Sequence, residues 1–181
     1  MKKNITNFIQ TDKGIIFLII AIIFISAGVY SVYTKPIVTD IEYSYNGIKY
    51  QVGNLDYEEP INLEINGVYT KVRSSGEVLF KGDIIINGVK SIGYGNDGNE
   101  YAFNNESNHN VIKWDDFTGD VFISDKFKEL SIDILRANGK EGYSFSYNDG
   151  WIISAPCNSR DEAVEISNKL IQKLHKDVLI K

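Results

Sequence analysis

The chain has 181 residues, enough for one domain and an additional segment. Its composition, 43% apolar, 12% aromatic and 24% charged, excludes an intrinsically disordered chain. The net charge of −5 argues against nucleic-acid binding, and a single cysteine excludes an internal disulfide. Lysine outnumbers arginine, and isoleucine and asparagine are abundant, which favours an AT-rich bacterial source.

The first predicted element is a transmembrane helix at residues 14–34. The run Gly14–Tyr33 contains no charged residue, and twenty helical residues rise about 30 Å, the thickness of the hydrocarbon core of a bilayer. Because this run is longer than the apolar region of a signal peptide, we expect an uncleaved anchor that contacts the lipid bilayer. A signal peptide cleaved near Ile25–Ala27 or Val29–Ser31 is the alternative.

The charges before this helix predict its orientation. Three lysines precede it and a single aspartate opposes them: Lys2, Lys3, Lys13 and Asp12. The positive-inside rule therefore places residues 1–13 in the cytoplasm as a short tail. Residues 35–39 are then a linker, and residues 40–181 form the extracytoplasmic domain of a single-pass protein of the cell membrane.

The extracytoplasmic domain is predicted to be mainly antiparallel β-sheet, a sandwich or a barrel-like fold, with a C-terminal helix. Asn-Gly pairs lie between segments in which apolar and polar residues alternate, a pattern typical of β-hairpins with type I′ turns. We expect three such turns, at Asn46-Gly47, Asn66-Gly67 and Asn87-Gly88. Further strand candidates follow at intervals of about ten residues, which favours a sandwich or barrel.

The last predicted element is an amphipathic helix at residues 159–176. Ser159 and Glu162 have the spacing of a capping box. The apolar residues of the segment recur at helical spacing and would share one face: Ala163, Ile166, Leu170 and Leu174. The polar face is not strongly basic, so we expect this helix to pack on the sheet and not on a membrane surface.

A seven-residue pattern occurs twice, as FKGDIII at Phe80–Ile86 and as FTGDVFI at Phe117–Ile123. Each copy has an aromatic residue, a Gly-Asp pair and three apolar residues. We interpret the repeat as a pattern that begins a strand, because Gly permits unusual backbone angles and the Asp side chain can accept hydrogen bonds from the backbone of a turn. A cation site is conceivable if Asp83 and Asp120, the two aspartates of the repeat, converge in space.

Cys157, His109 and Arg160 are candidate catalytic residues, because a thiol, an imidazole and a guanidinium together can catalyse acyl transfer. The order of a cytoplasmic N-terminus, one anchor, an outer β domain and a late cysteine resembles that of the sortases, the cell-wall transpeptidases. The resemblance is one of plan and implies a membrane-anchored thiol transpeptidase or hydrolase using Cys157 with His109. The motif differs, since Ser154-Ala155-Pro156-Cys157 stands where sortases carry Thr-Leu-x-Thr-Cys.

The function that we expect instead is a non-catalytic binding or structural module at the cell envelope, because no other catalytic motif is present. Tyr43, Tyr45 and Tyr50 are expected on one face of the first hairpin, where they could bind an envelope protein or a wall polymer. The few histidines and the lone cysteine are too widely spaced for zinc. The oxygen-rich stretch Gly95–Asn110 could ligate Ca²⁺, but its spacing matches no calcium loop, so we expect no metal and no cofactor.

Overall fold

The computed structural model describes residues 12–93, 99–103, 108–139 and 142–181. Most of the predicted N-terminal tail, including Lys2 and Lys3, lies outside the described residues, as does much of the stretch proposed for Ca²⁺. The structure therefore does not test the expectation that this stretch binds no Ca²⁺.

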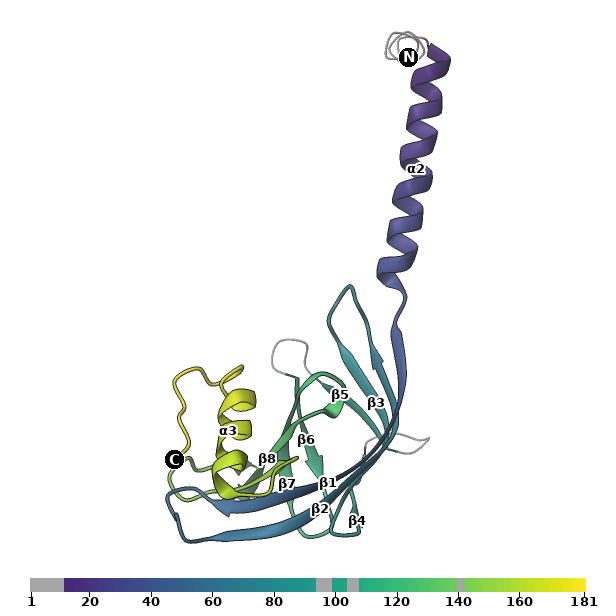
Figure 1. Cartoon of the computed structure of the whole chain (residues 1–181). Helices are drawn as coiled ribbons and strands as arrows, with labels where there is room; N and C mark the ends of the chain where they lie inside the picture. The colour runs from purple at the N-terminus through teal and green to yellow at the C-terminus, as the bar shows by residue number, and fades with distance from the viewer. Residues whose placement is uncertain (1–11, 94–98, 104–107, 140–141) are drawn as a thin grey trace.

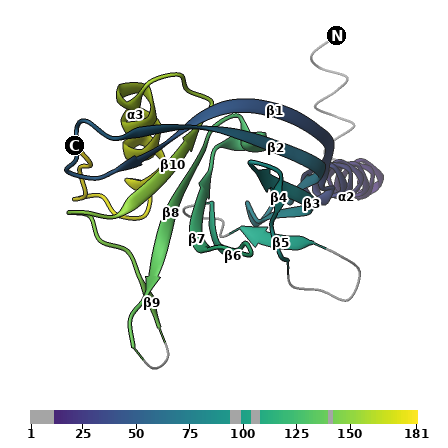
Figure 2. The same cartoon turned by 90° about the horizontal axis from the view of Figure 1, so that it is seen from below.

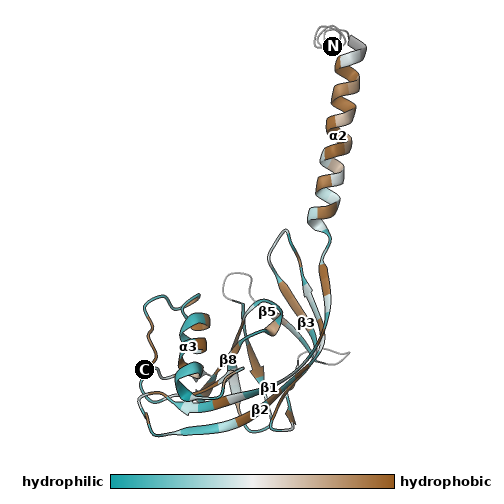
Figure 3. Ribbon diagram, viewed as in Figure 1, coloured by the Kyte–Doolittle hydropathy of each residue, from teal (hydrophilic) through white to brown (hydrophobic). Residues whose placement is uncertain are grey.

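The N-terminal helix α2 (Asp12–Thr34) extends away from the rest of the molecule (Figure 1). Its apolar side chains are exposed along its length, Phe24 for example at 74%, and the ribbon of this helix in Figure 3 is mostly brown, the colour of hydrophobic residues. The stretch Gly14–Thr34 is long and apolar enough to cross a membrane. The structure thus confirms an apolar N-terminal helix, a feature that membrane anchors share with signal sequences.

The rest of the described chain is mainly antiparallel β-sheet. Its strands are β1 (Ile37–Gln51), β2 (Glu58–Lys71), β3 (Val78–Ile86), β4 (Val89–Lys90), β5 (Glu100–Phe103), β6 (His109–Lys113), β7 (Thr118–Ile123), β8 (Leu130–Ala137), β9 (Tyr143–Ser144) and β10 (Trp151–Ala155). They pair in the order β4-β3-β2-β1-β10-β8-β7-β6, with β5 beside β3 and β9 beside β8. The sheet curls into a half-barrel (Figure 2), so the barrel-like prediction describes it better than a sandwich of two stacked sheets.

Two of the three predicted Asn-Gly turns are wrong. Asn46-Gly47 lies inside β1 and Asn66-Gly67 inside β2, and these two long strands pair with each other. Close packing explains Gly67, because a Cβ there would lie only 2.7 Å from the Cα of Gly82, its partner on β3. Asn87-Gly88 is a true two-residue turn with φ values of 50° and 83°, as type I′ requires, and it joins β3 to β4.

The sheet carries a core on each face. The core on its concave face includes large side chains from most strands: Ile41, Leu63, Phe80, Trp114 and Ile132. The second core lies beneath helix α3 (Arg160–Ile171) and includes Ile48, Tyr50, Phe122, Ile152 and Leu170. Alternate residues of a strand face opposite sides, so Tyr50 belongs to the second core, whereas Tyr43 and Tyr45 pack against the first. The prediction of one shared tyrosine face is therefore wrong.

The C-terminal helix is present but shorter than predicted. Ser159 caps it by accepting a hydrogen bond from the Glu162 N–H (3.4 Å). It ends at Ile171 and not at residue 176, because the chain turns there and returns along the helix. The Asn168 side chain holds this tail by bonding both the N–H (2.8 Å) and the carbonyl (3.0 Å) of Ile180.

Candidate functional site

Cys157, the predicted nucleophile, follows β10 and lies in the core beneath α3, where it is 4% exposed. Its thiol donates a hydrogen bond to the carbonyl of Ser154 (3.0 Å). Burial raises the pKa of Cys157 to about 11. A thiol in this environment is protonated at neutral pH and is a poor nucleophile.

His109, the predicted base, is the first residue of β6, and its partner is Asp120 instead of Cys157. Its Nδ1 lies 2.9 Å from Oδ1 of Asp120, and its ring stacks on Phe122. The hydrogen bond with Asp120 raises the pKa of His109 above its ordinary value. Within the described residues no hydrogen bond or ion pair joins His109 to Cys157.

Arg160 begins α3 and is largely buried. Its guanidinium donates a hydrogen bond to the carbonyl of Lys181 (2.9 Å) and lies 5.3 Å from the centre of the Tyr50 ring. These contacts fasten the C-terminal tail to the helix. The structure therefore does not bring the three catalytic candidates together in the part of the chain that it describes.

The tyrosines proposed for binding differ in accessibility. Tyr43 and Tyr45 are half-buried beside the concave core and stack with their ring centres 5.2 Å apart. Tyr50 is fully buried, and its hydroxyl donates a hydrogen bond to Oγ of Ser167 (2.7 Å). In this structure Tyr43 and Tyr45 can touch a partner, whereas Tyr50 cannot.

Polar side chains between the sheet and α3 were not anticipated from the sequence. Ser167 lies 2.7 Å from Oγ of Ser154 and 3.2 Å from Oγ of Ser131, and it also bonds the carbonyl of Ala163. All three serines and Tyr50 are buried. Because every hydroxyl has a partner, this cluster attaches the helix to the sheet in one position.

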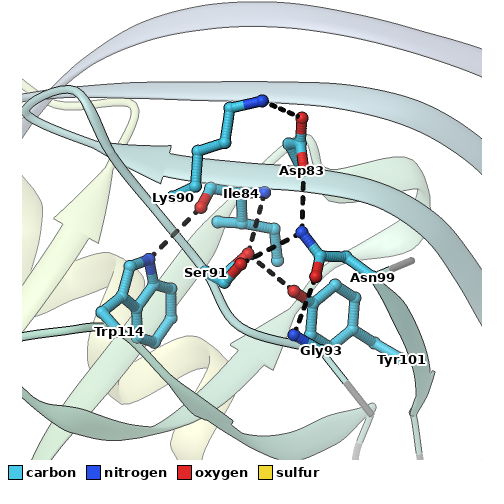
Figure 4. Close-up of polar contacts among 8 residues, drawn as sticks. All are labelled: Asp83, Ile84, Lys90, Ser91, Gly93, Asn99, Tyr101 and Trp114. Carbon is cyan, nitrogen blue, oxygen red and sulfur yellow. Dashed lines mark hydrogen bonds and ion pairs between the residues drawn. The ribbon is translucent and has the colours of Figure 1, made fainter. Parts of the chain in front are cut away.

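The first copy of the Gly-Asp repeat lies in a structural network on β3 (Figure 4). Asp83 pairs with Lys90 (2.7 Å) and accepts a hydrogen bond from the side-chain amide of Asn99 (2.9 Å). The hydrogen bond from Lys90 is the main cause that lowers the pKa of Asp83. Gly82 lies in the middle of β3, so this copy of the repeat does not open a strand.

The same network fastens the segment after β4 to β3. The Ser91 hydroxyl accepts hydrogen bonds from the Ile84 N–H (3.1 Å) and from the Tyr101 hydroxyl (2.7 Å). The Trp114 indole N–H donates to the Ile84 carbonyl (3.2 Å), as Figure 4 shows. The groups around Asp83 are thus paired with one another, which indicates a structural role.

The second copy of the repeat has different surroundings. Asp120 on β7 stands directly opposite Asp133 on β8, and residues directly opposite one another share a face of the sheet. Asp133 is 2% exposed, and its carboxyl accepts no hydrogen bond from the described residues, with Oδ1 fully buried. Burial and, to a smaller extent, the charge of Asp120 raise the pKa of Asp133 well above its ordinary value.

These two carboxyl groups line a pocket of about 390 Å³ whose walls are largely aromatic. Phe145 and Tyr147 meet edge to face at 4.9 Å, and Tyr147 meets His175 in the same way at 5.9 Å. Burial, and then the charges of Asp133 and Asp120, raise the pKa of Tyr147. We take this pocket as the candidate functional site, because a buried carboxyl without a partner is costly unless it has a role.

The two repeat aspartates have separate partners, Lys90 and Asn99 for Asp83 and His109 for Asp120. Nothing among the described residues joins them, and no group of three or more potential metal ligands occurs in that part of the chain. The sequence did contain a signal for the pocket. Asp133 interrupts the apolar strand LSIDILR, although the pattern could not show that its face is covered.

Comparisons of the chain with protein-family models, with curated proteins and with solved structures gave no match.

Proposed function

We propose that this chain is a membrane-anchored binding module whose β domain lies on the outer side of the cytoplasmic membrane. The observation that carries the proposal is the exposed apolar helix α2, which is separated from β1 by only two residues. A long helix with apolar side chains on all sides is unfavourable in water and favourable in a bilayer. The lysines before it support a cytoplasmic N-terminus.

The geometry favours binding over thiol chemistry. A transpeptidase or hydrolase needs a thiolate beside a base, whereas Cys157 is buried and bonded to a backbone carbonyl, and His109 is bonded to Asp120. The accessible parts of Tyr43 and Tyr45 are candidate contacts for an envelope protein or a wall polymer.

The burial of Cys157 makes a clean topology experiment possible. Leu55, in the turn between β1 and β2, is 72% exposed, so Leu55→Cys adds one reactive thiol to the domain. We expect a membrane-impermeant maleimide to label this variant rapidly on intact cells and to leave the wild type unlabelled. A Lys3→Cys variant is expected to react only after lysis. The reverse pattern would refute the orientation, and recovery of the wild-type protein in the soluble fraction would refute the anchor.

A further inference from the structure

The lining of the candidate pocket includes two carboxyl groups, and within the described chain only one of them has a hydrogen-bond partner. Asp120 is hydrogen-bonded to His109, but Asp133 has no hydrogen-bond partner in the described chain. A carboxyl group removed from water without a partner lowers the stability of the fold. A ligand that donates hydrogen bonds and carries positive charge would satisfy Asp133 and offset this cost.

We propose that the pocket formed by β7, β8, the segment after β9 and the turn after α3 binds a small organic ammonium ion. This inference goes beyond the proposed function and does not rest on it, because the site has the same chemistry on either side of a membrane. The ammonium group lies between Asp120 and Asp133 and donates a hydrogen bond to Asp133. Charge-assisted bonds of this kind are stronger than those between neutral groups.

The walls of the pocket suit the organic part of such a ligand. Phe145 and Tyr147 line the pocket together with the two carboxyl groups and are half-buried, whereas Tyr143 and Ser144 in the same lining are exposed. Aromatic faces attract ammonium groups and also contact alkyl chains. The volume of about 390 Å³ falls within the range of small-molecule pockets.

A metal ion fits these surroundings less well. Ca²⁺ takes six to eight oxygen ligands and Mg²⁺ requires octahedral geometry, whereas among the described residues only Asp120 and Asp133 supply carboxylates to the pocket lining. No cluster of three potential metal ligands occurs among the described residues. The aromatic walls therefore favour an organic cation.

The experiment measures thermal unfolding of the full chain in detergent micelles with butylammonium as the probe. Sodium chloride at the same ionic strength controls for screening, and butan-1-ol controls for the alkyl chain. We expect butylammonium to raise the unfolding temperature of the wild type in a saturable way, because a ligand that binds only the folded state stabilises it. Neither control is expected to do so.

Asp133→Asn is the decisive variant, because it keeps the shape of the side chain and removes its charge. We expect it to bind butylammonium about tenfold more weakly. Asp83→Asn is the matched control, since it makes the same substitution in a strand of the same sheet, at an aspartate that does not line the pocket and is already paired with Lys90 and Asn99. We expect Asp83→Asn to bind as the wild type does.

Three results would overturn the proposal. The first is a stabilisation by butylammonium no larger than that by sodium chloride or butan-1-ol. The second is equal affinity in the wild type and in Asp133→Asn. The third is saturable stabilisation by calcium or magnesium chloride that depends on Asp133 and excludes butylammonium, which would make the pocket a metal site.

Discussion

Asp133 couples the stability of the fold to pH. Its folded-state pKa lies above the unfolded value because burial, and then the charge of Asp120, disfavour the ionised form. Below the unfolded pKa of about 3.9 both states hold the proton and there is no penalty. Between the unfolded pKa and the raised folded pKa, the unfolded state has released this proton and the folded state still holds it. The contribution of this group to stability therefore falls as the pH rises through this range.

We therefore predict that Asp133→Asn stabilises the unliganded protein at neutral pH. The expected gain is about 1–3 kcal/mol, because asparagine remains a buried polar group but cannot ionise, so the variant loses the cost of burying a charged carboxylate. The gain should vanish below about pH 4, where the carboxyl group is protonated in both states. The measurement is thermal unfolding of the wild type and the variant across this pH range. A variant that is equally or less stable at neutral pH would show that Asp133 is satisfied in the folded protein.

Asp83 serves as the control, because its effect on stability depends on pH in the opposite direction to that of Asp133. The hydrogen bonds from Lys90 and Asn99 lower its pKa, so its stabilising contribution is present above the unfolded pKa and is lost on acidification. We expect Asp83→Asn to lower the unfolding temperature at neutral pH and to have little effect in acid.

The strands show what local sequence patterns can and cannot predict. The Asn87-Gly88 turn depends only on local sequence, because it needs two adjacent residues with positive φ, and it was predicted correctly. Asn46-Gly47 and Asn66-Gly67 have the same sequence, but their glycines are needed for close packing against strands that are distant in the sequence. A Cβ on Gly47 would lie 2.6 Å from the carbonyl oxygen of Ser154, on β10. Such contacts cannot be read from a window of ten residues.

Gly67 provides a test of this explanation. We predict that Gly67→Ala destabilises the domain by about 1–3 kcal/mol, because the added methyl group would be forced against β3. Val68→Ala on the exposed face of the same strand is the control and should have a much smaller effect. Chemical denaturation would measure both. If Gly67→Ala were no more destabilising than Val68→Ala, Gly67 would not be held by close packing.

The attachment of α3 depends on the buried hydroxyl cluster. We predict that Ser167→Ala costs about 1–3 kcal/mol, because it leaves the Tyr50 and Ser154 hydroxyls without their shared partner. Tyr50→Phe should destabilise the Ser167→Ala variant much less than it destabilises the wild type, because the partner of the Tyr50 hydroxyl is already absent from that variant. A double-mutant cycle by denaturation tests this coupling, and strict additivity would contradict it.

The candidate site was only partly foreseeable. Asp120 was singled out as part of the repeat, whereas Asp133 was not, although it is a charged residue in an apolar strand. Their pairing depends on the register between β7 and β8, and the burial of Asp133 depends on residues after β9 and α3 that cover it. The thiol hypothesis used residue types alone, and residue types could not show that the end of β10 is covered by a helix, which leaves Cys157 buried.

The whole molecule is an exposed apolar helix joined to a folded domain by Lys35 and Pro36. Pro36 has a fixed φ and the connection is short, so a helix that spans the membrane would hold the domain near the membrane surface. In that arrangement the half-barrel begins beside the headgroups and α3 lies at its far end (Figure 1).

We predict that the full-length chain, including α2, resists extraction by alkaline carbonate and that the double substitution Ile19→Lys with Ile23→Lys abolishes this resistance. Each lysine near the centre of a spanning helix costs about 2.5–3.5 kcal/mol, whereas each large aliphatic residue contributes only about −0.3 to −0.6 kcal/mol. Two lysines together cost about 5–7 kcal/mol, which cancels the favourable sum of the remaining large apolar residues. Leu55→Lys with Leu179→Lys adds the same charge to exposed positions of the domain and should remain with the membranes. An intact mass that lacks the first residues of α2 would instead identify the helix as a cleaved signal sequence.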